Sequence, residues 1–404
     1  MGKVLFVSYD GMTDPLGQSQ VLAYMEGLSQ LEHTIHILSF EKPEAPQATH
    51  QAVKQRMDKA GIIWHPLTYT KKPPILSTVY DLYKGWRLAA KIQETEKFDI
   101  VHCRMLLTAI IGLKMQSAFG TKVIFDMRGW WVDEKLESGL WDSFVYAPVY
   151  RFLKYLEKRS FKRAEVTVSL THAGKQEIER QLGQLKNPVP VIPTCVNFKF
   201  FPPFSGTVRN EVRAQLGISP EAKVLIYSGS IGANYNLSTL FKIFEGLDKT
   251  NSGWHLLVLS NTDANQILAE AKNYSFDPSR VFVKGVEYSK VSSHLMAGDA
   301  GLIFYKPAFS LIGRCPTKMA EYLATGLPVL SIKGIGDVDF LLLKFPESGC
   351  LLTNVEKDDY KFVSDTLMRY AVNKEKLRAY AVDYFDVNKG IESYNNVYKQ
   401  LLTS

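Results

Sequence analysis

Residues 314–328 read R-C-P-T-K-M-A-E-Y-L-A-T-G-L-P and lie between two apolar runs, Leu302–Tyr305 and Val329–Ile332. Pro316 suits the first position of a helix, because its missing N–H would be unpaired there anyway. Gly326 ends the helical pattern. The stretch therefore predicts a short helix between two buried strands, the unit from which parallel α/β sheets are built.

The first turn of this helix combines groups that suit a nucleotide. Its free N–H groups and the positive end of the helix dipole favour an anion. Lys318 lies in the same turn, where a cation is disfavoured unless an anion lies between it and the N–H groups. Glu321 shares a face with Lys318. A nucleoside diphosphate fits, with phosphates on Lys318 and ribose hydroxyls on Glu321. The alternative is a surface helix with a Lys–Glu pair, worth ~0.2–0.5 kcal/mol.

Composition limits the class of protein. With 404 residues, 46% hydrophobic and 22% charged, the chain predicts a soluble globular protein of two or three domains. The net charge of +7 suits a polyanionic ligand or an anionic membrane surface and is too diffuse for nucleic acid. Four scattered cysteines without CxxC spacing indicate a reducing compartment. Since no signal peptide or apolar stretch of ~18 residues is found, we expect a cytoplasmic protein.

Short apolar runs alternate with helical patterns along both halves of the chain. Because these runs lack strict alternation, they predict strands buried on both faces, and hence two doubly wound parallel sheets facing a central cleft. The predicted strands are Lys3–Ser8, Thr34–Phe40, Ile62–Pro66, Ile100–Cys103, Lys122–Asp126, Val166–Ser169, Val189–Ile192, Val224–Ser228, His255–Ser260, Val281–Lys284, Leu302–Tyr305, Val329–Ile332 and Cys350–Leu352. We expect domains at 1–195 and 208–385, a proline-rich linker at 196–207, and a C-terminal helix at 386–404.

In each half of the chain, a glycine-containing turn follows the first predicted strand. The loop Tyr9–Gln20 contains Gly17 and Gln18, with Asp14 beside them, and matches neither GxGxxG nor GxxxxGK[ST]. It predicts a turn that contacts phosphate or sugar at a helix N-terminus; an ordinary connecting loop is the alternative. In the second half, Gly229 and Ser230 open a turn where the backbone could approach a ligand closely, or simply reverse direction.

The loop after the strand Lys122–Asp126 carries Arg128, Trp130 and Trp131. Arg128 could bind a phosphate or a sugar hydroxyl, and the two indoles could contact a sugar ring or an apolar acceptor. The alternative is that both indoles pack in the core and that Arg128 pairs with Asp133 or Glu134. His102, at the end of a strand, is either a site residue or a structural histidine.

The pair Asp337 and Asp339 resembles a metal-binding DxD motif, but we interpret it as a helix N-cap with a first-turn acid. No histidine or third carboxylate nearby completes a magnesium or manganese shell. We therefore expect no metal.

Two basic and apolar segments, 150–163 and 71–76, are typical of surfaces that contact anionic lipid. A solvated helix face that covers the sheet is the alternative for the first of them.

Several segments together resemble bacterial GT-B glycosyltransferases of the large retaining family that includes capsule and lipopolysaccharide enzymes. The matching motifs are Y-D-G-M-T-D-P-L-G-Q-S-Q, D-M-R-G-W-W-V-D-E, G-S-I-G-A-N-Y and P-T-K-M-A-E-Y-L-A-T-G-L-P-V, and the resemblance covers nearly the whole chain. It implies two Rossmann-like domains, with a C-terminal helix that crosses back to the first.

The resemblance also implies roles for individual residues. Lys318 would hold the donor diphosphate and Glu321 the ribose hydroxyls. Other donor contacts would come from the first-domain turn, the second-domain turn, the position after Gly285, and the loop before the helix; these are Gly17, Gln18, Gly229, Ser230, Val286, Ser310, Arg314, Pro316 and Thr317. His102 and Arg128 would line the acceptor side, with Asp14, Trp130 and Trp131.

The chain departs from the family pattern at two places. A glutamate often found eight residues before Glu321 is replaced by Gly313, and Ser230–Asn236 contains no arginine or lysine. Arg314 or Lys306 would then supply the missing charge.

The resulting prediction is a metal-independent, retaining transfer of a sugar from a UDP- or GDP-sugar to a lipid-linked or oligosaccharide hydroxyl. It would serve cell-surface polysaccharide synthesis at the inner face of the cytoplasmic membrane. Two alternatives remain: a sugar-nucleotide 2-epimerase, which would need acid and base carboxylates such as Asp126, Asp133 and Glu134, and a non-catalytic subunit that binds sugar nucleotides.

Overall fold

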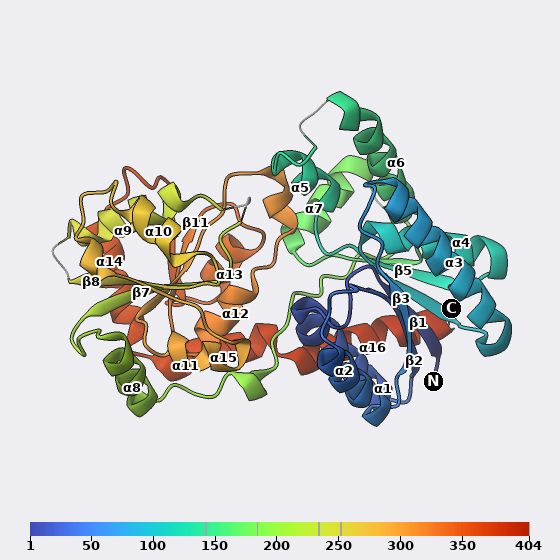
Figure 1. The fold of residues 1–404 in the computed structure, drawn as a ribbon, viewed down its shortest axis with the longest axis horizontal. Helices are drawn as coiled ribbons and strands as arrows, with labels where there is room; N and C mark the ends of the chain where they lie inside the picture. Colours follow the sequence, from blue (N-terminus) through green and yellow to red (C-terminus); the bar gives the residue numbers. More distant parts are fainter. Residues whose placement is uncertain (142–143, 184, 233–234, 251–252, 404) are drawn as a thin grey trace. The chain divides into compact units, whose positions relative to one another are not determined.

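The computed structural model describes residues 1–141, 144–183, 185–232, 235–250 and 253–403. The chain forms two compact units (Figure 1). Unit 1 comprises Met1–Thr194, Phe309–Arg314 and Val387–Ser404, and unit 2 comprises Cys195–Ala308 and Cys315–Asp386. The chain therefore enters unit 1 three times. The sequence did not predict that the segment Phe309–Arg314 belongs to unit 1. Residues 196–207, which were predicted to form a linker, group with unit 2.

Unit 1 is built on a six-stranded parallel sheet in the order β3-β2-β1-β4-β5-β6. Its strands are β1 (Lys3–Ser8), β2 (Thr34–Glu41), β3 (Ile63–Thr68), β4 (Ile100–Arg104), β5 (Lys122–Asp126) and β6 (Val166–Val168). The strand order reverses between β1 and β4, and open sheets of this kind bind ligands beyond the strand carboxyl ends at such a switch point.

The helices of unit 1 cover both faces of this sheet. They are η1 (Gly17–Leu22), α1 (Ala23–Gln30), α2 (Gln47–Lys59), α3 (Leu76–Glu96), α4 (Met105–Phe119), α5 (Trp131–Glu137), η2 (Phe144–Tyr146), α6 (Ala147–Arg163), α7 (His172–Leu182), η5 (Phe309–Gly313) and α16 (Val387–Thr403). α4 packs between α3 and α6, and α16 packs against α1. The predicted C-terminal helix thus lies on unit 1.

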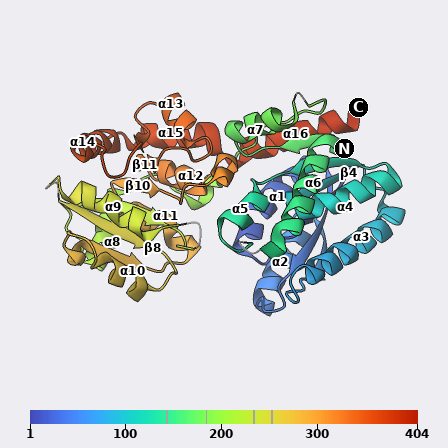
Figure 2. The same cartoon turned by 90° about the horizontal axis from the view of Figure 1, so that it is seen from above.

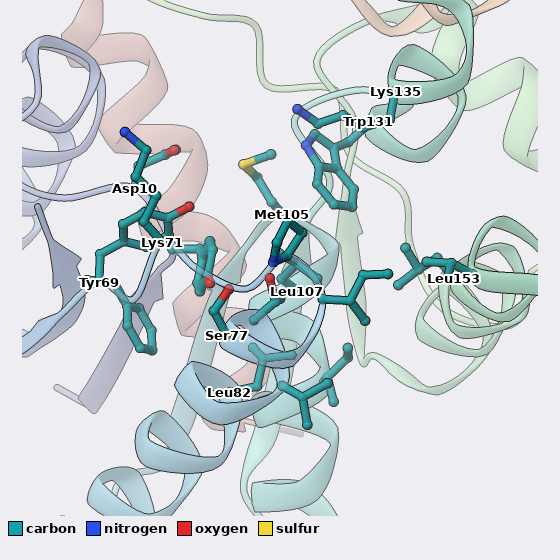
Figure 3. A pocket seen from close by; sticks show the side chains of 18 of the residues that line it. Asp10, Tyr69, Lys71, Ser77, Leu82, Met105, Leu107, Trp131, Lys135 and Leu153 are labelled. Carbon is teal, nitrogen blue, oxygen red and sulfur yellow. The ribbon is translucent and has the colours of Figure 1, made fainter. Parts of the chain in front are cut away.

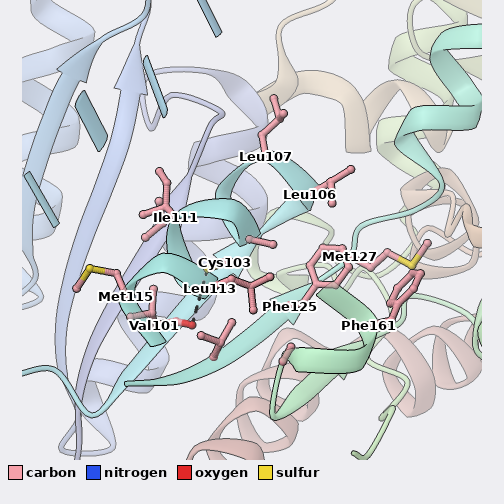
Figure 4. Packing of buried hydrophobic residues seen from close by; sticks show 14 of the residues in the cluster. Val101, Cys103, Leu106, Leu107, Ile111, Leu113, Met115, Phe125, Met127 and Phe161 are labelled. Carbon is pink, nitrogen blue, oxygen red and sulfur yellow. Dashed lines mark hydrogen bonds between the residues drawn. The ribbon is translucent and has the colours of Figure 1, made fainter. Parts of the chain in front are cut away.

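Alternate residues of each strand point to opposite faces, as the strand period requires. Val101 and Cys103 of β4 and Phe125 of β5 face a core that α4 and α6 cover with Leu106 and Phe161 (Figure 4). The adjacent residues His102 and Asp126 therefore face the other side, where they contact Tyr398 and Tyr394 of α16.

Unit 2 repeats the architecture with the order β12-β11-β10-β7-β8-β9. Its strands are β7 (Lys223–Ser228), β8 (Trp254–Leu259), β9 (Val281–Lys284), β10 (Ala300–Ile303), β11 (Val329–Ile332) and β12 (Gly349–Leu352). Its helices are η3 (Phe198–Phe200), α8 (Gly206–Leu216), α9 (Leu237–Asp248), α10 (Ala264–Ala271), η4 (Pro278–Arg280), α11 (Tyr288–Leu295), α12 (Thr317–Ala324), α13 (Val338–Lys344), α14 (Tyr360–Ala371) and α15 (Lys374–Phe385). α9, α10 and α14 share one core with the sheet, and α12 packs against α15 (Figure 2). The switch point lies between β7 and β10.

Most predicted strands are found within one or two residues of their expected ends, but Val189–Ile192 forms only an isolated bridge between Ser169 and Val191. The reason is local, because Pro188 and Pro190 carry no N–H and cannot continue a ladder. Their carbonyls still accept hydrogen bonds from Thr167 and Ser169.

Candidate active site

Lys318 lies in a cluster of tyrosines in unit 2. Its Nζ is 3.1 Å from the Tyr227 hydroxyl and 3.0 Å from the Tyr235 hydroxyl. The same ammonium lies 4.3, 4.5 and 5.6 Å from the ring centroids of Tyr227, Tyr235 and Tyr305. Aromatic faces attract a cation at these distances. The cluster therefore holds the charge of Lys318 in one place.

The fold brings these four residues together at the switch point. Tyr227 belongs to β7, Tyr305 follows β10, and Lys318 is the second residue of α12. Gly229 has φ +132°, and a Cβ there would lie 2.8 Å from Cε of Lys318. Glycine is thus required both for the backbone conformation and for the passage of the lysine stem. This is a specific reason for the glycine turn after β7.

Glu321 lies one turn after Lys318 and is buried, with 8% of its surface exposed. Burial raises the pKa of Glu321 to about 7, and the charge of Lys318 opposes that shift. Next to it, Tyr322 accepts a hydrogen bond from Ser228 N–H and donates one to the Leu302 carbonyl. α12 is therefore fixed to β7 and β10 while it presents Lys318 and Glu321.

The other predicted donor residues of unit 2 lie on surrounding segments. Pro316 precedes α12 as its N-cap rather than as its first residue, and Thr317 begins the helix. The Ser230 carbonyl accepts a hydrogen bond from Tyr227. Val286 follows the edge strand β9 and is half-buried.

The first part of the loop 310–317, which we expected to wrap the donor phosphates, groups with unit 1. Glu137 accepts hydrogen bonds from the N–H groups of Phe309 and Ser310 at 2.6 and 3.2 Å. Arg314 pairs with Glu134 at 2.7 Å. Lys306, the other residue expected to supply the charge missing from the glycine turn, is exposed.

Gly313, which stands where the family resemblance expects a glutamate, is tightly packed against unit 1. A Cβ at Gly313 would lie 2.8 Å from Cδ1 of Trp130 and 3.1 Å from Cα of Gly129. A longer side chain would require both neighbours to move. The substitution therefore goes together with the packing of Trp130 in unit 1.

The opening loop of unit 1 is held by a carboxylate that the sequence analysis missed. Glu41 accepts hydrogen bonds from the N–H groups of Met12 and Thr13, at 2.8 and 3.0 Å. Gln18 donates to the Thr13 carbonyl, and Asp14 pairs with Lys42. The loop is thus held in place by side chains from within it and from the end of β2.

Gly17 has a packing role of its own. A Cβ there would lie 2.2 Å from the Gly11 carbonyl oxygen and 2.8 Å from Cα of Met12. Only glycine permits this close approach of two backbone segments.

Two arginines converge at the carboxyl ends of β4 and β5. Arg104 and Arg128 both donate to Oε1 of Gln20, at 3.2 and 3.0 Å. Arg104 also pairs with Asp10, while Arg128 lies 3.9 Å from Asp126. Burial opposes ionisation of Asp126, but Arg128, His102 and Arg104 lower its pKa below the usual value. The partners of Arg128 thus include Gln20, Thr194 and Asp126, and Arg104 is an additional candidate.

His102 lies in the interior of unit 1. It is fully buried, and its Nδ1 lies 2.8 Å from the Tyr398 hydroxyl of α16. Burial lowers its pKa, and Asp126 opposes that effect. The side chain joins the sheet to the C-terminal helix.

The two adjacent tryptophans, Trp130 and Trp131, differ in how much of each side chain is exposed. Trp130 has 1% of its surface exposed and packs with Phe161 and Phe309, so the expectation that it contacts an acceptor is not met. Trp131 opens α5, is partly exposed and packs edge-on against Trp141. Trp130 thus belongs to the core of unit 1, and Trp131 packs against that core from a partly exposed position.

The basic segment 150–163 coincides with most of α6. Lys154 is neutralised by Asp133 and Glu157, and Arg163 bonds Gln116 and Ser117. The exposed face of α6 still carries cations beside two large apolar side chains, Phe152 and Tyr155.

Among the described residues, no group of three or more His, Cys, Asp or Glu side chains is arranged to hold a metal ion. Within the same ranges, no helix is long and apolar enough to cross a membrane.

Known proteins match this chain in part of its sequence and in its fold. Residues 17–195 match the family described as glycosyl transferase 4-like domain. The fold is similar to sucrose-phosphate synthase from Thermosynechococcus elongatus, with a TM-score of 0.77 at 14% identity over 100% of both chains. The structure of Anabaena HepE in complex with UDP and glucose is similar with a TM-score of 0.70, at 14% sequence identity over 99% of this chain and 100% of that chain. WaaG, a glycosyltransferase involved in lipopolysaccharide biosynthesis, is similar with a TM-score of 0.66, at 15% sequence identity over 98% of this chain and 99% of that chain. No curated protein matches the sequence.

The two parallel sheets and their order define the chain as a GT-B protein. The match to the glycosyl transferase 4-like domain lies almost entirely within unit 1, and the chain as a whole shares its fold with glycosyltransferases such as WaaG.

Proposed function

We propose that this enzyme transfers a sugar from a nucleotide-sugar donor, most simply a UDP-sugar, to a hydroxyl of an acceptor. The observation that carries the proposal is the position of Lys318, held by tyrosines beside Gly229 at the switch point of unit 2. Support for UDP comes from Anabaena HepE, which has a similar fold and was solved with UDP-glucose.

The reaction breaks the bond between the anomeric carbon and the diphosphate oxygen, and forms a bond from that carbon to the acceptor oxygen. The hydroxyl proton leaves to the departing phosphate or to solvent, while negative charge grows on the diphosphate. A fixed cation and N–H groups placed where that charge develops accelerate such a step, and loss of one such donor typically costs ~10²–10³ in rate. Lys318 and the first N–H groups of α12 fit this role, so the proposal requires no metal.

Glu321 would accept hydrogen bonds from the ribose hydroxyls. Its burial makes the isolated carboxylate costly, and hydroxyl donors would favour the ionised form. Nucleotide binding should therefore lower the pKa of Glu321. Thr317, Ser230 and Val286 would complete the donor contacts.

On the acceptor side, we propose roles for Arg128, Asp14 and Trp131. Arg128 is anchored by Gln20 and Thr194, which fixes its guanidinium for contact with a hydroxyl or a phosphate. The same proposal includes retention of the anomeric configuration and a lipid-linked or oligosaccharide acceptor. It also includes a role in the synthesis of cell-surface polysaccharide at an anionic membrane.

The test is a transfer and hydrolysis assay with a panel of UDP- and GDP-sugars, comparing wild type with Lys318→Ala. Lys361→Ala, which removes an exposed lysine of α14 in the same unit, serves as the control. We expect turnover with one base and a loss of about 10²–10³ in Lys318→Ala alone. Nucleotide binding without turnover on any acceptor would favour a non-catalytic subunit, and conversion of the donor without acceptor would favour a 2-epimerase.

A further inference from the structure

Unit 1 contains a cavity that the sequence analysis did not anticipate. Its volume is about 710 Å³, within the range of ~300–1,000 Å³ typical of sites for small organic ligands. It lies at the switch point of the sheet, since Tyr9 and Asp10 follow β1 and Met105 follows β4. This is the place where open parallel sheets bind ligands.

Most of the cavity wall is apolar. Leu82 of α3, Leu107 of α4 and Leu153 of α6 line it, together with Trp131 and Trp141. Figure 3 shows Trp131 and Lys135 on one side of the cavity, and Tyr69 and Lys71 on the other. The wall therefore suits a hydrocarbon chain rather than a sugar.

The charges that line the cavity leave a positive excess. Asp10 pairs with Arg104, and Asp14 pairs with Lys42. Lys71 and Lys135 also line the cavity, and in the described part of the chain neither makes an ion pair. Two such cations beside an apolar space are complementary to an anionic group on an apolar chain.

The rim adds exposed apolar surface. Ile75 and Val79, at the start of α3, and Phe152 of α6 line the cavity, with 43%, 59% and 59% of their surfaces exposed. Both segments expected to contact lipid, 71–76 and 150–163, thus meet at one cavity. Ile75 and Met105 also have φ of +70°, an uncommon conformation for non-glycine residues that clusters at binding sites.

From these observations we propose that the cavity binds the apolar chain of the acceptor, an amphiphile that carries a phosphate held between Lys71 and Lys135. This proposal rests on the proposed transferase function, because it identifies the acceptor class. The nucleotide site would serve the donor in unit 2, and the cavity would select acceptors with a long chain and an anionic group.

The experiment measures binding of n-octyl, n-decyl and n-dodecyl phosphate, each below its micelle concentration, to the full-length protein. Trp131 and Trp141 in the wall provide a fluorescence signal. Each buried methylene should tighten binding about fourfold. Replacing both Lys71 and Lys135 by glutamine should weaken dodecyl phosphate binding about tenfold or more, because each charged contact is lost. Lys91→Gln, an exposed lysine of α3, is the control.

A second pair of variants tests the cavity itself. Leu82→Trp should fill the space and abolish the dependence on chain length, whereas Tyr83→Trp, at the neighbouring exposed position, should preserve it. Equal affinity for all chain lengths, or equal effects of the two tryptophan variants, would overturn the proposal. UDP binding is measured on the same samples: amphiphile binding without UDP binding would refute the donor site and leave the cavity standing.

Discussion

Glu321→Gln offers the sharpest test of the electrostatics of the donor site. Burial raises the pKa of Glu321 from an ordinary value of 4.5 to about 7. A shift of this size, at ~1.36 kcal/mol per unit, corresponds to about 3 kcal/mol. The folded protein thus holds a proton that the unfolded chain releases, and ionisation of Glu321 in the folded state is costly.

Proton linkage gives the direction in which the free energy of unfolding changes with pH. Between about pH 4.5 and pH 7 the folded state binds more protons than the unfolded state, so the contribution of Glu321 to the free energy of unfolding falls as pH rises. Glutamine does not ionise. The free energy of unfolding of Glu321→Gln, relative to wild type, should therefore rise across this window by up to about 3 kcal/mol and stay level above it.

The assay is urea denaturation of both proteins at pH 4.5, 5.5, 6.5 and 8, followed by circular dichroism. Glu375→Gln, at an exposed position of α15, controls for the loss of one negative charge. If the stability difference between Glu321→Gln and wild type is the same at pH 4.5 and pH 8, the reasoning about a buried, costly carboxylate is refuted.

Three further predictions concern the donor site and the packing around it. Turnover should persist in excess EDTA, because Lys318 supplies the charge that a metal would otherwise provide; loss of activity that Mg²⁺ or Mn²⁺ restores would contradict this. Gly313→Glu should destabilise the protein by ~1–3 kcal/mol in denaturant titrations, since Trp130 leaves no room for a Cβ; an unchanged midpoint would show that the neighbours yield freely. Gly17→Ala should lower the melting temperature, although the same change in an open helix usually stabilises, because its Cβ meets the Gly11 carbonyl; a raised melting temperature would refute the packing argument.

Much of the fold could be predicted because buried parallel strands are short apolar runs, which are local features of sequence. Lys318 and Glu321 could be paired for the same reason, as they lie on one helix. The strand prediction failed at Val189–Ile192, where prolines interrupt the donors of a ladder. Apolar content alone did not reveal that interruption.

The parts that could not be predicted depend on contacts between distant segments. Tyr227, Tyr235 and Tyr305 reach Lys318 from three separate loops and strands, so no spacing reveals them. His102 is covered by Tyr398, which lies 296 residues away. The cavity in unit 1 likewise combines α3, α4, α5 and α6 with loops after β1 and β3.

The central claim is that Lys318 binds the diphosphate of a nucleotide donor. Isothermal titration of UDP into wild type, Lys318→Ala and Lys361→Ala at pH 8 tests it most directly. We predict binding by wild type and Lys361→Ala, and a loss of about 10- to 150-fold in Lys318→Ala, the value of one hydrogen bond to a charged group. Equal UDP affinity in all three proteins would contradict the claim.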